Sequence, residues 1–190
     1  AHVVVAIDTS RSMGCGSPSK LECAKLIAAS LCYIGLVNLD SVSLFAFDRE
    51  LRPLRQGARG KGMVLRFLED IDRLAPSGTT DMAAALATHQ AAFKDVGVFF
   101  LISDFLDREG WRKILRSPAG GVRQTNLLHI MSVEELEPTE RGRTILTDAE
   151  SGRERSLEIG PRAVERYRAL LGERLAELER HAREREMGYL

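Results

Sequence analysis

Short runs of apolar residues recur along the chain and are the clearest structural signal in it. Each run is close to continuously hydrophobic and rich in β-branched or aromatic residues. Strands that are buried on both faces of a parallel sheet show this pattern. We therefore predict central strands at Val3–Ile7, Val42–Phe47, Val96–Ser103 and Leu127–Val133.

Segments with helical periodicity alternate with these runs. Their apolar residues recur at i, i+3 and i+4, which is the spacing of one helix face. The predicted helices are Lys20–Leu36, Gly62–Leu74, Asp81–Phe93, with Thr80 or Asp81 as N-cap, and a shorter Trp111–Arg116. Alternating strands and helices predict the α/β class, with a doubly wound, mostly parallel sheet flanked by helices. Residues 48–57 add an expected antiparallel edge strand.

The last third of the chain has a different pattern. The turn-forming residues 149–152 separate Arg143–Asp148 from Arg153–Ile159, which predicts a β-hairpin. A long helix, Pro161–Met187, follows, and we expect its leucine-rich stripe to dock on the sheet. We therefore divide the chain into a core, residues 1–135, and a C-terminal hairpin plus helix, residues 136–190, packed on the same domain.

Composition and charge narrow the function classes. The 190 residues include 27 basic and 27 acidic side chains, so we expect no nucleic-acid partner that binds through a broad basic surface. No apolar stretch approaches the ~18 residues of a membrane-spanning helix. Three cysteines without a disulfide framework favour a reducing, cytoplasmic location. Because the chain starts within a core strand, we expect it to be a fragment of a longer protein.

Candidate chemistry follows the first predicted strand. Asp8, Ser10 and Ser12 place one carboxylate and two hydroxyls at alternate positions just beyond the strand's C-terminal end. In open α/β sheets, ligands bind at this edge. Hard divalent cations such as Mg²⁺ take oxygen ligands of these kinds. A single carboxylate with neutral hydroxyls leaves such an ion open to a further anion, as an adhesive site requires.

Two distant segments point to the same edge. Thr80 lies in the loop that enters the third predicted helix, and Asp104 directly follows the strand ending at Ser103. Since loops after parallel strands converge on one rim, we expect these two residues to join the first motif around one ion.

These residues resemble a known family. The Asp8-x-Ser10-x-Ser12 motif, a Gly-Thr-Thr-Asp loop and a strand ending in Ser-Asp are similar to the von Willebrand factor A domain with its metal-ion-dependent adhesion site. The narrower resemblance is to a bacterial family catalogued as domain of unknown function 58. It rests on Asp-Thr-Ser-Arg-Ser-Met, Ser19-Lys20-Leu21-Glu22, Leu101-Ile102-Ser103-Asp104-Phe105-Leu106 and Asp148…Ser151-Gly152.

The resemblance implies a role for each candidate residue. Ser10, Ser12 and Thr80, with Thr79 as the fallback for Thr80, would bind the metal directly. Asp8 and Asp104 would be acidic ligands, either direct or through water. The implied metal is Mg²⁺, with Mn²⁺ or Ca²⁺ as alternatives. The sixth coordination position would be left to a carboxylate from a partner protein.

The resemblance also implies partners and a setting. Proteins of this family typically carry membrane helices ahead of the domain and are associated with MoxR-type AAA+ ATPases in chaperone or assembly systems. We therefore expect a partner that presents Asp or Glu, among which a MoxR-type ATPase is a candidate. The expected location is cytoplasmic, at the cytoplasmic face of the inner membrane for a full-length, anchored protein.

Three alternatives stand beside this hypothesis. The metal could be purely structural, with the hairpin and the last helix holding the partner. A Mg²⁺-dependent phosphatase would use Asp8 as nucleophile, but Ser10 stands where such enzymes need a second Asp as general acid. Asp8, Ser10 and Ser12 could instead merely cap the helix that starts near Lys20. We expect no catalytic residues.

Overall fold

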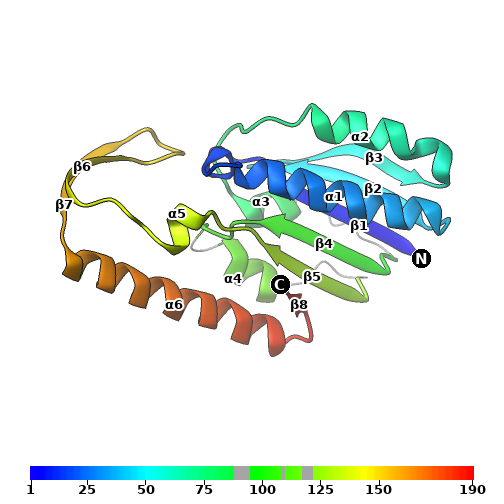
Figure 1. Ribbon diagram of the computed structural model, residues 1–190. Helices are drawn as coiled ribbons and strands as arrows, with labels where there is room; N and C mark the ends of the chain where they lie inside the picture. Colours follow the sequence, from blue (N-terminus) through cyan, green and yellow to red (C-terminus); the bar gives the residue numbers. More distant parts are fainter. Residues whose placement is uncertain (88–94, 108–109, 117–121) are drawn as a thin grey trace.

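A six-stranded sheet forms the centre of the computed structural model, which describes residues 1–87, 95–107, 110–116 and 122–190 (Figure 1). The strand order is β3-β2-β1-β4-β5-β8. All neighbours pair in parallel except β2 and β3, which are antiparallel. The strands are β1 (His2–Asp8), β2 (Ser41–Phe47), β3 (Leu51–Ala58), β4 (Val98–Ser103), β5 (Gln124–His129) and β8 (Gly188–Tyr189).

Helices cover both faces of this sheet. They are α1 (Lys20–Val37), α2 (Val64–Asp72), α3 (Met82–Ala87), α4 (Gly110–Arg116), α5 (Val133–Leu136) and α6 (Pro161–Arg183), with short 3₁₀ turns η1 (Arg11–Gly14) and η2 (Lys61–Met63). Side chains on β1 alternate between the faces, as the pleat of a strand requires. Val5 and Ile7 pack with α1 and α2, whereas Val4 and Ala6 pack with α3, α4 and α6. The predicted doubly wound α/β class is confirmed.

The expected edge strand and hairpin are also present. Residues 51–58 form β3, which pairs with β2 despite Pro53, because an edge strand can lose one donor. The hairpin consists of β6 (Gly142–Thr147) and β7 (Glu154–Ile159), which form a separate two-stranded sheet. It follows α5 and precedes α6 in the chain, and Figure 1 shows it standing apart from the main sheet, on the side where α6 begins.

The last of the predicted central strands was placed too far along the chain. Leu127–Val133 was expected, but β5 spans Gln124–His129, and Val133 begins α5 instead. The reason is local. The Ser132 hydroxyl accepts a hydrogen bond from the Glu135 backbone N–H, and the Glu135 carboxylate accepts one from the Ser132 backbone N–H. This reciprocal cap starts a helix and ends the strand.

The last helix only partly follows its prediction. Its stripe was expected to dock on the sheet, and the stripe is buried at Val164 near the start of the helix and at Leu178 and Ala182 near its end. Tyr167, also in the stripe, is 41% exposed. The helix ends at Arg183, four residues before the predicted Met187, and the chain then turns back into β8.

One predicted helix runs into residues that the structure does not describe. The helix expected at Asp81–Phe93 is seen as α3, and its continuation through 88–94 lies outside the described residues. The Asp81 carboxylate accepts a hydrogen bond from the Ala84 backbone N–H at 2.9 Å, so Asp81 rather than Thr80 acts as the cap. The residues that follow α4, 117–121, also lie outside the described part of the chain. The division at residue 135 stays a prediction.

Candidate metal centre

The site lies where β1 and β4, neighbours in the sheet, both end. Asp8 closes β1 and Ser103 closes β4. The Ser103 hydroxyl donates to Asp8 Oδ2 at 2.6 Å, and both side chains are fully buried. The chain leaves β1 toward β2 on one side and reaches β4 only after crossing to the other side. Such a switch of direction opens a ligand crevice at the carboxyl ends of the strands.

The hydroxyls of the first motif lie together immediately beyond β1. Ser10 and Ser12 are buried, and their Oγ atoms are 3.1 Å apart. The Ser10 backbone N–H donates to Asp8 Oδ1 at 2.9 Å, which fixes the carboxylate against the turn. The η1 turn that follows holds Ser12 and brings its side chain back toward the strand end.

Thr80 reaches this rim through a loop packed on the first motif. The Ser77 N–H donates to the Thr9 carbonyl at 2.7 Å, and the Arg11 N–H donates to the Gly78 carbonyl at 3.4 Å. The Thr80 hydroxyl in turn donates to Glu150 Oε1 at 2.7 Å. The loop is therefore adjacent to the motif, and Thr80 faces the turn of the β6–β7 hairpin.

Asp104 is engaged in a buried ion pair. Lys20 Nζ lies 2.8 Å from Asp104 Oδ2 and also pairs with Glu135. The side chains of Lys20 and Asp104 are 1% and 2% exposed. Burial alone would lower the pKa of Lys20, but the charges and hydrogen bonds of Asp104 and Glu135 outweigh it and raise that pKa.

Asp8, by contrast, forms no ion pair within the described part of the chain. Burial, reinforced by the negative charge of Asp104, raises the pKa of Asp8 from 3.8 to about 7. The hydrogen bonds from Ser103 and Ser10 offset only part of this rise. The ionised form of a fully buried carboxylate is unfavourable, and a bound cation would stabilise it.

The donor set fits a hard divalent cation held mainly by hydroxyls. No group of three or more His, Cys, Asp or Glu side chains gathers as a metal site among the described residues. The set here instead mixes two carboxylates with serine and threonine oxygens. In an octahedron with metal–oxygen distances of about 2.1 Å, neighbouring ligand oxygens are about 3.0 Å apart. Ser10 Oγ and Ser12 Oγ are hydrogen-bonded at 3.1 Å, so both oxygens are close enough to bind one ion.

Helix capping does not account for the motif. The N-cap of α1 is Ser19, whose hydroxyl accepts from the Glu22 N–H while the Glu22 carboxylate accepts from the Ser19 N–H. Asp8, Ser10 and Ser12 lie outside this cap. The interpretation of these three residues as caps of α1 is therefore wrong.

Three contacting residues were missed by sequence analysis. Ser103 and Lys20 were quoted only within motifs and as ends of predicted elements, and neither was given a role in the site. Lys20 had a usable signal, since it shares the helix face of Ala24, Ala28 and Cys32, all of them buried. Glu150 had none, because its contact with Thr80 spans 70 residues of sequence.

The fold and the polar residues at the carboxyl edge of the sheet together define the class of protein. The molecule has the von Willebrand factor A type of α/β fold, with the Asp-x-Ser-x-Ser motif at the carboxyl edge of its sheet. The family model described as "Protein of unknown function DUF58" matches residues 1–176, and the chain belongs to that family. That the five candidate residues bind a metal stays a prediction.

The curated relatives are longer than the region that matches this chain. Uncharacterized protein Rv1480 of Mycobacterium tuberculosis is 26% identical over 163 residues, which are 84% of this chain and 51% of that protein. Uncharacterized protein Mb1516 of Mycobacterium bovis matches equally well. The chain thus spans about half the length of the curated relatives it matches. None of its described helices has the length and apolar character needed to cross a membrane.

Solved structures support the fold. An aerotolerance-related membrane protein from Bacteroides fragilis is similar over 89% of this chain and 87% of that chain, with a TM-score of 0.56 and 19% identity. The conserved hypothetical protein BatB from Bacteroides thetaiotaomicron is similar over 95% and 99%, with a TM-score of 0.54 and 13% identity. A von Willebrand factor type A protein from Catenulispora acidiphila is similar over 66% and 32%, with a TM-score of 0.51 and 19% identity.

Proposed function

We propose that this chain is a non-catalytic, divalent-metal-dependent protein-interaction domain that binds an acidic side chain of a partner. The observation that carries the proposal is the fully buried Asp8 carboxylate, which has no countercharge among the described ion pairs and adjoins the Ser10 and Ser12 hydroxyls. A bound Mg²⁺ or Mn²⁺ would supply positive charge and a coordination position for a carboxylate.

Each candidate ligand has a distinct task in this proposal. Ser10, Ser12 and Thr80 offer neutral hydroxyl oxygens, so they hold a cation without neutralising it fully. Asp8 contributes the charge that Lys20 does not balance, because Lys20 already pairs with Asp104. The ion therefore keeps net attraction for an external carboxylate, which is the physical basis of metal-dependent adhesion.

The setting is part of the same proposal. The family resemblance points to a MoxR-type AAA+ ATPase as the partner, within a chaperone or assembly system. The similar Bacteroides fragilis protein is described as a membrane protein. We place this domain at the cytoplasmic face of a membrane in the full-length protein.

Calorimetric titration of Mn²⁺ and Mg²⁺ into metal-free protein tests the site. We expect binding heat for the wild type and for the control Ser30→Ala, whose hydroxyl only contacts the Leu26 carbonyl on the surface of α1. Asp8→Ala and Ser10→Ala should weaken binding at least tenfold, in line with the loss of a metal ligand. Equal affinity in the Asp8→Ala variant, or no binding by the wild type, would reject the proposal.

Partner binding separates an adhesive metal from a structural one. A purified MoxR-type ATPase from the same organism should bind the wild type in Mg²⁺, release it on addition of EDTA, and not bind Asp8→Ala. If EDTA lowers only the thermal stability of the domain and leaves partner binding intact, the metal is structural and the hairpin and α6 hold the partner.

A Mg²⁺-dependent phosphatase is the second candidate function, and only the position of Asp8 favours it. Asp8 is placed at a strand end, as a nucleophile would be, but the residue two positions on is Ser10, whose hydroxyl bonds to Ser12. A serine hydroxyl is no general acid at neutral pH. Steady turnover of p-nitrophenyl phosphate with Mg²⁺, lost in Asp8→Ala, would favour this candidate over the interaction domain.

A further inference from the structure

The turn of the β6–β7 hairpin lies against the candidate metal centre. Glu150, in this turn, accepts two hydrogen bonds at Oε1, from the Thr80 hydroxyl at 2.7 Å and from the Thr80 backbone N–H at 3.2 Å. Arg11 Nη1 donates to the Glu150 carbonyl at 3.3 Å. Figure 1 shows the closed end of the hairpin reaching the turn that follows β1. A carboxylate of this chain is thus bonded to a residue predicted to bind the metal.

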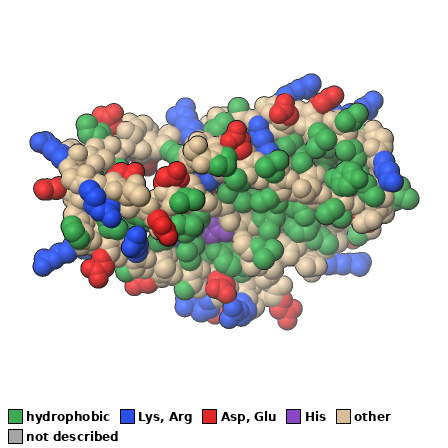
Figure 2. Space-filling model, viewed as in Figure 1, with side chains coloured by type: hydrophobic (Ala, Val, Ile, Leu, Met, Phe, Trp, Pro, Cys, Tyr) green, Lys and Arg blue, Asp and Glu red, His purple; other side chains and the backbone are tan. Residues whose placement is uncertain are grey.

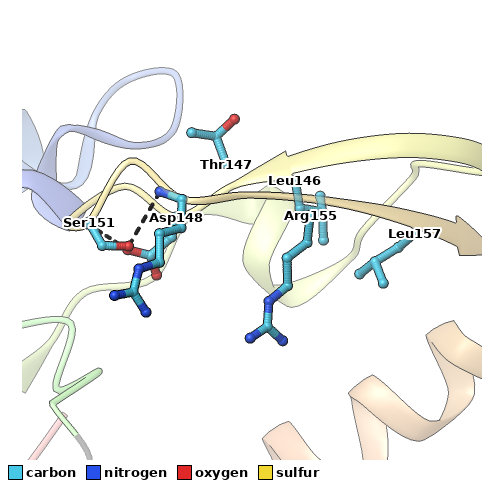
Figure 3. Close-up of a pocket in the computed structure, with 7 residues that line it drawn as sticks. Leu146, Thr147, Asp148, Ser151, Arg155 and Leu157 are labelled. Carbon is cyan, nitrogen blue, oxygen red and sulfur yellow. Dashed lines mark hydrogen bonds between the residues drawn. The ribbon is translucent and has the colours of Figure 1, made fainter.

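The turn itself is a preformed structure. The Asp148 carboxylate accepts hydrogen bonds from the Ser151 N–H and hydroxyl, each at 2.6 Å, as Figure 3 shows. The Ser151 hydrogen bonds lower the pKa of Asp148, so this carboxylate stays ionised. Gly152 supplies a positive φ of 68° and its N–H donates to the Asp148 carbonyl. Glu150 is therefore presented by an ordered turn.

The Glu150 carboxylate lies beside a candidate metal ligand. Thr80 Oγ1 and Glu150 Oε1 are hydrogen-bonded at 2.7 Å, as the two serine hydroxyls are at 3.1 Å. A cation that binds the Thr80 hydroxyl oxygen is therefore within reach of a Glu150 carboxylate oxygen.

The hairpin that carries Glu150 is only loosely tied to the rest of the fold. Its two strands pair with each other and not with the main sheet. Its apolar side chains are largely uncovered, with Ile145 63% and Leu157 46% exposed. Leu146, Arg155 and Leu157 line an open pocket along one side of it (Figure 3). An isolated two-stranded hairpin is only marginally stable, so it can move without disturbing the core.

We infer that Glu150 is an internal ligand of the metal centre, which holds the position that a partner's carboxylate takes and leaves it when the partner binds. This inference rests on the proposed function of the site. Because Glu150 is tethered nearby, its effective concentration exceeds that of any small carboxylate in solution. The hairpin thus excludes stray carboxylates, and only a partner with further contacts displaces it.

Mn²⁺ binding to the intact domain tests the inference, with Glu150→Ala as the variant and Glu154→Ala as the matched control on the same hairpin. Calorimetry gives the affinity, and water-proton relaxation gives the number of water molecules on the bound ion. In Glu150→Ala we expect roughly tenfold weaker binding and higher relaxivity, since water replaces a carboxylate ligand. Added acetate should lower the relaxivity of Glu150→Ala but not that of the wild type. Glu154→Ala should match the wild type throughout.

The outcomes separate this inference from the function it rests on. If Mn²⁺ binds the wild type and not Asp8→Ala, while Glu150→Ala keeps wild-type affinity, relaxivity and acetate response, the internal ligand is rejected and the metal site stands. If Mn²⁺ binds neither the wild type nor Glu150→Ala, or binds Asp8→Ala as well as the wild type, the metal centre and its internal ligand are rejected together.

Discussion

The buried Asp8 carboxylate is the least favourable charge of the candidate site. It accepts hydrogen bonds from Ser103 and from the Ser10 N–H, yet it is fully buried beside the charge of Asp104. Its folded pKa of about 7 lies above the ordinary value of 3.8. The protonated form is thus favoured by folding, and the ionised form at neutral pH is unfavourable until a cation binds.

Asp8→Asn should therefore stabilise the metal-free protein. Since the folded pKa is raised, the contribution of Asp8 to stability is present below about pH 4 and is lost as pH rises to about 7. In EDTA at pH 7.5 the free energy of unfolding of the variant should exceed that of the wild type by about 2–4 kcal/mol. At pH 4 the two proteins should be equally stable. Urea unfolding at both pH values measures this.

The exposed Asp72→Asn serves as the control and should leave the pH dependence unchanged. A variant that is no more stable than the wild type at pH 7.5 in EDTA would contradict the account of Asp8 as an unbalanced buried charge.

Lys20 balances the second buried carboxylate. Its ammonium lies between Asp104 and Glu135, so it ties β4 to the first residue of α1 and to α5. Lys20→Met should keep the stem of the side chain and remove the charge, leaving Asp104 buried and unpaired. We expect a loss of about 3–5 kcal/mol in the free energy of unfolding.

Lys25→Met, whose ammonium only donates to the Asp72 carbonyl at the surface, should cost less than about 1 kcal/mol. Chemical denaturation of the two variants makes the comparison. Similar stabilities for both variants would show that the buried pair with Asp104 contributes little.

Among the elements, α6 divides into positions that are buried and positions that face solvent, and Val164 near its start is buried like the residues near its end. Near its end, Leu178 and Ala182 join the core cluster under the sheet, and His181 packs near Trp111 of α4. Nearer its start, Leu170 is 54% exposed. Arg174 anchors the middle of the helix through a hydrogen bond to the Phe105 carbonyl at 2.6 Å. Figure 2 shows charged side chains gathered on the side of the molecule where the hairpin and α6 lie.

Substitutions at two leucines test this division. Leu178→Ala should cost about 2–5 kcal/mol, because it opens a cavity at a side chain that is 2% exposed. Leu170→Ala should change the free energy of unfolding by less than about 0.5 kcal/mol. Urea unfolding curves measure both losses, and equal losses at the two positions would mean that Leu170 is also packed in solution.

At the scale of the whole molecule, the sheet order creates the site. Because β1 lies between β2 and β4, its end is next to that of β4, whose neighbouring loops carry polar residues. Asp8 and Ser103 meet there although 95 residues separate them. The hairpin adds a third approach from the C-terminal third, through Glu150. Segments from the beginning, middle and end of the chain thus converge on one rim.

Local patterns in the sequence were sufficient for most elements. Continuous apolar runs predicted β1, β2 and β4 to within two residues, since burial on both faces leaves no room for polar side chains. The helical spacing from Lys20 predicted α1. The prediction failed at Val133, where a side-chain cap between Ser132 and Glu135 outweighed apolar character. β8 was missed because two residues carry no period.

The sequence by itself determined the class of fold and the first motif of the site, because strand and helix periods and the Asp-x-Ser-x-Ser spacing are local properties. Only the tertiary structure decided which charges are balanced. Lys20 neutralises Asp104 and leaves Asp8 without a countercharge among the residues that the structure describes, and Glu150 reaches Thr80 across 70 residues. Such pairings depend on the packing of distant segments, and no periodic signal along the chain encodes them.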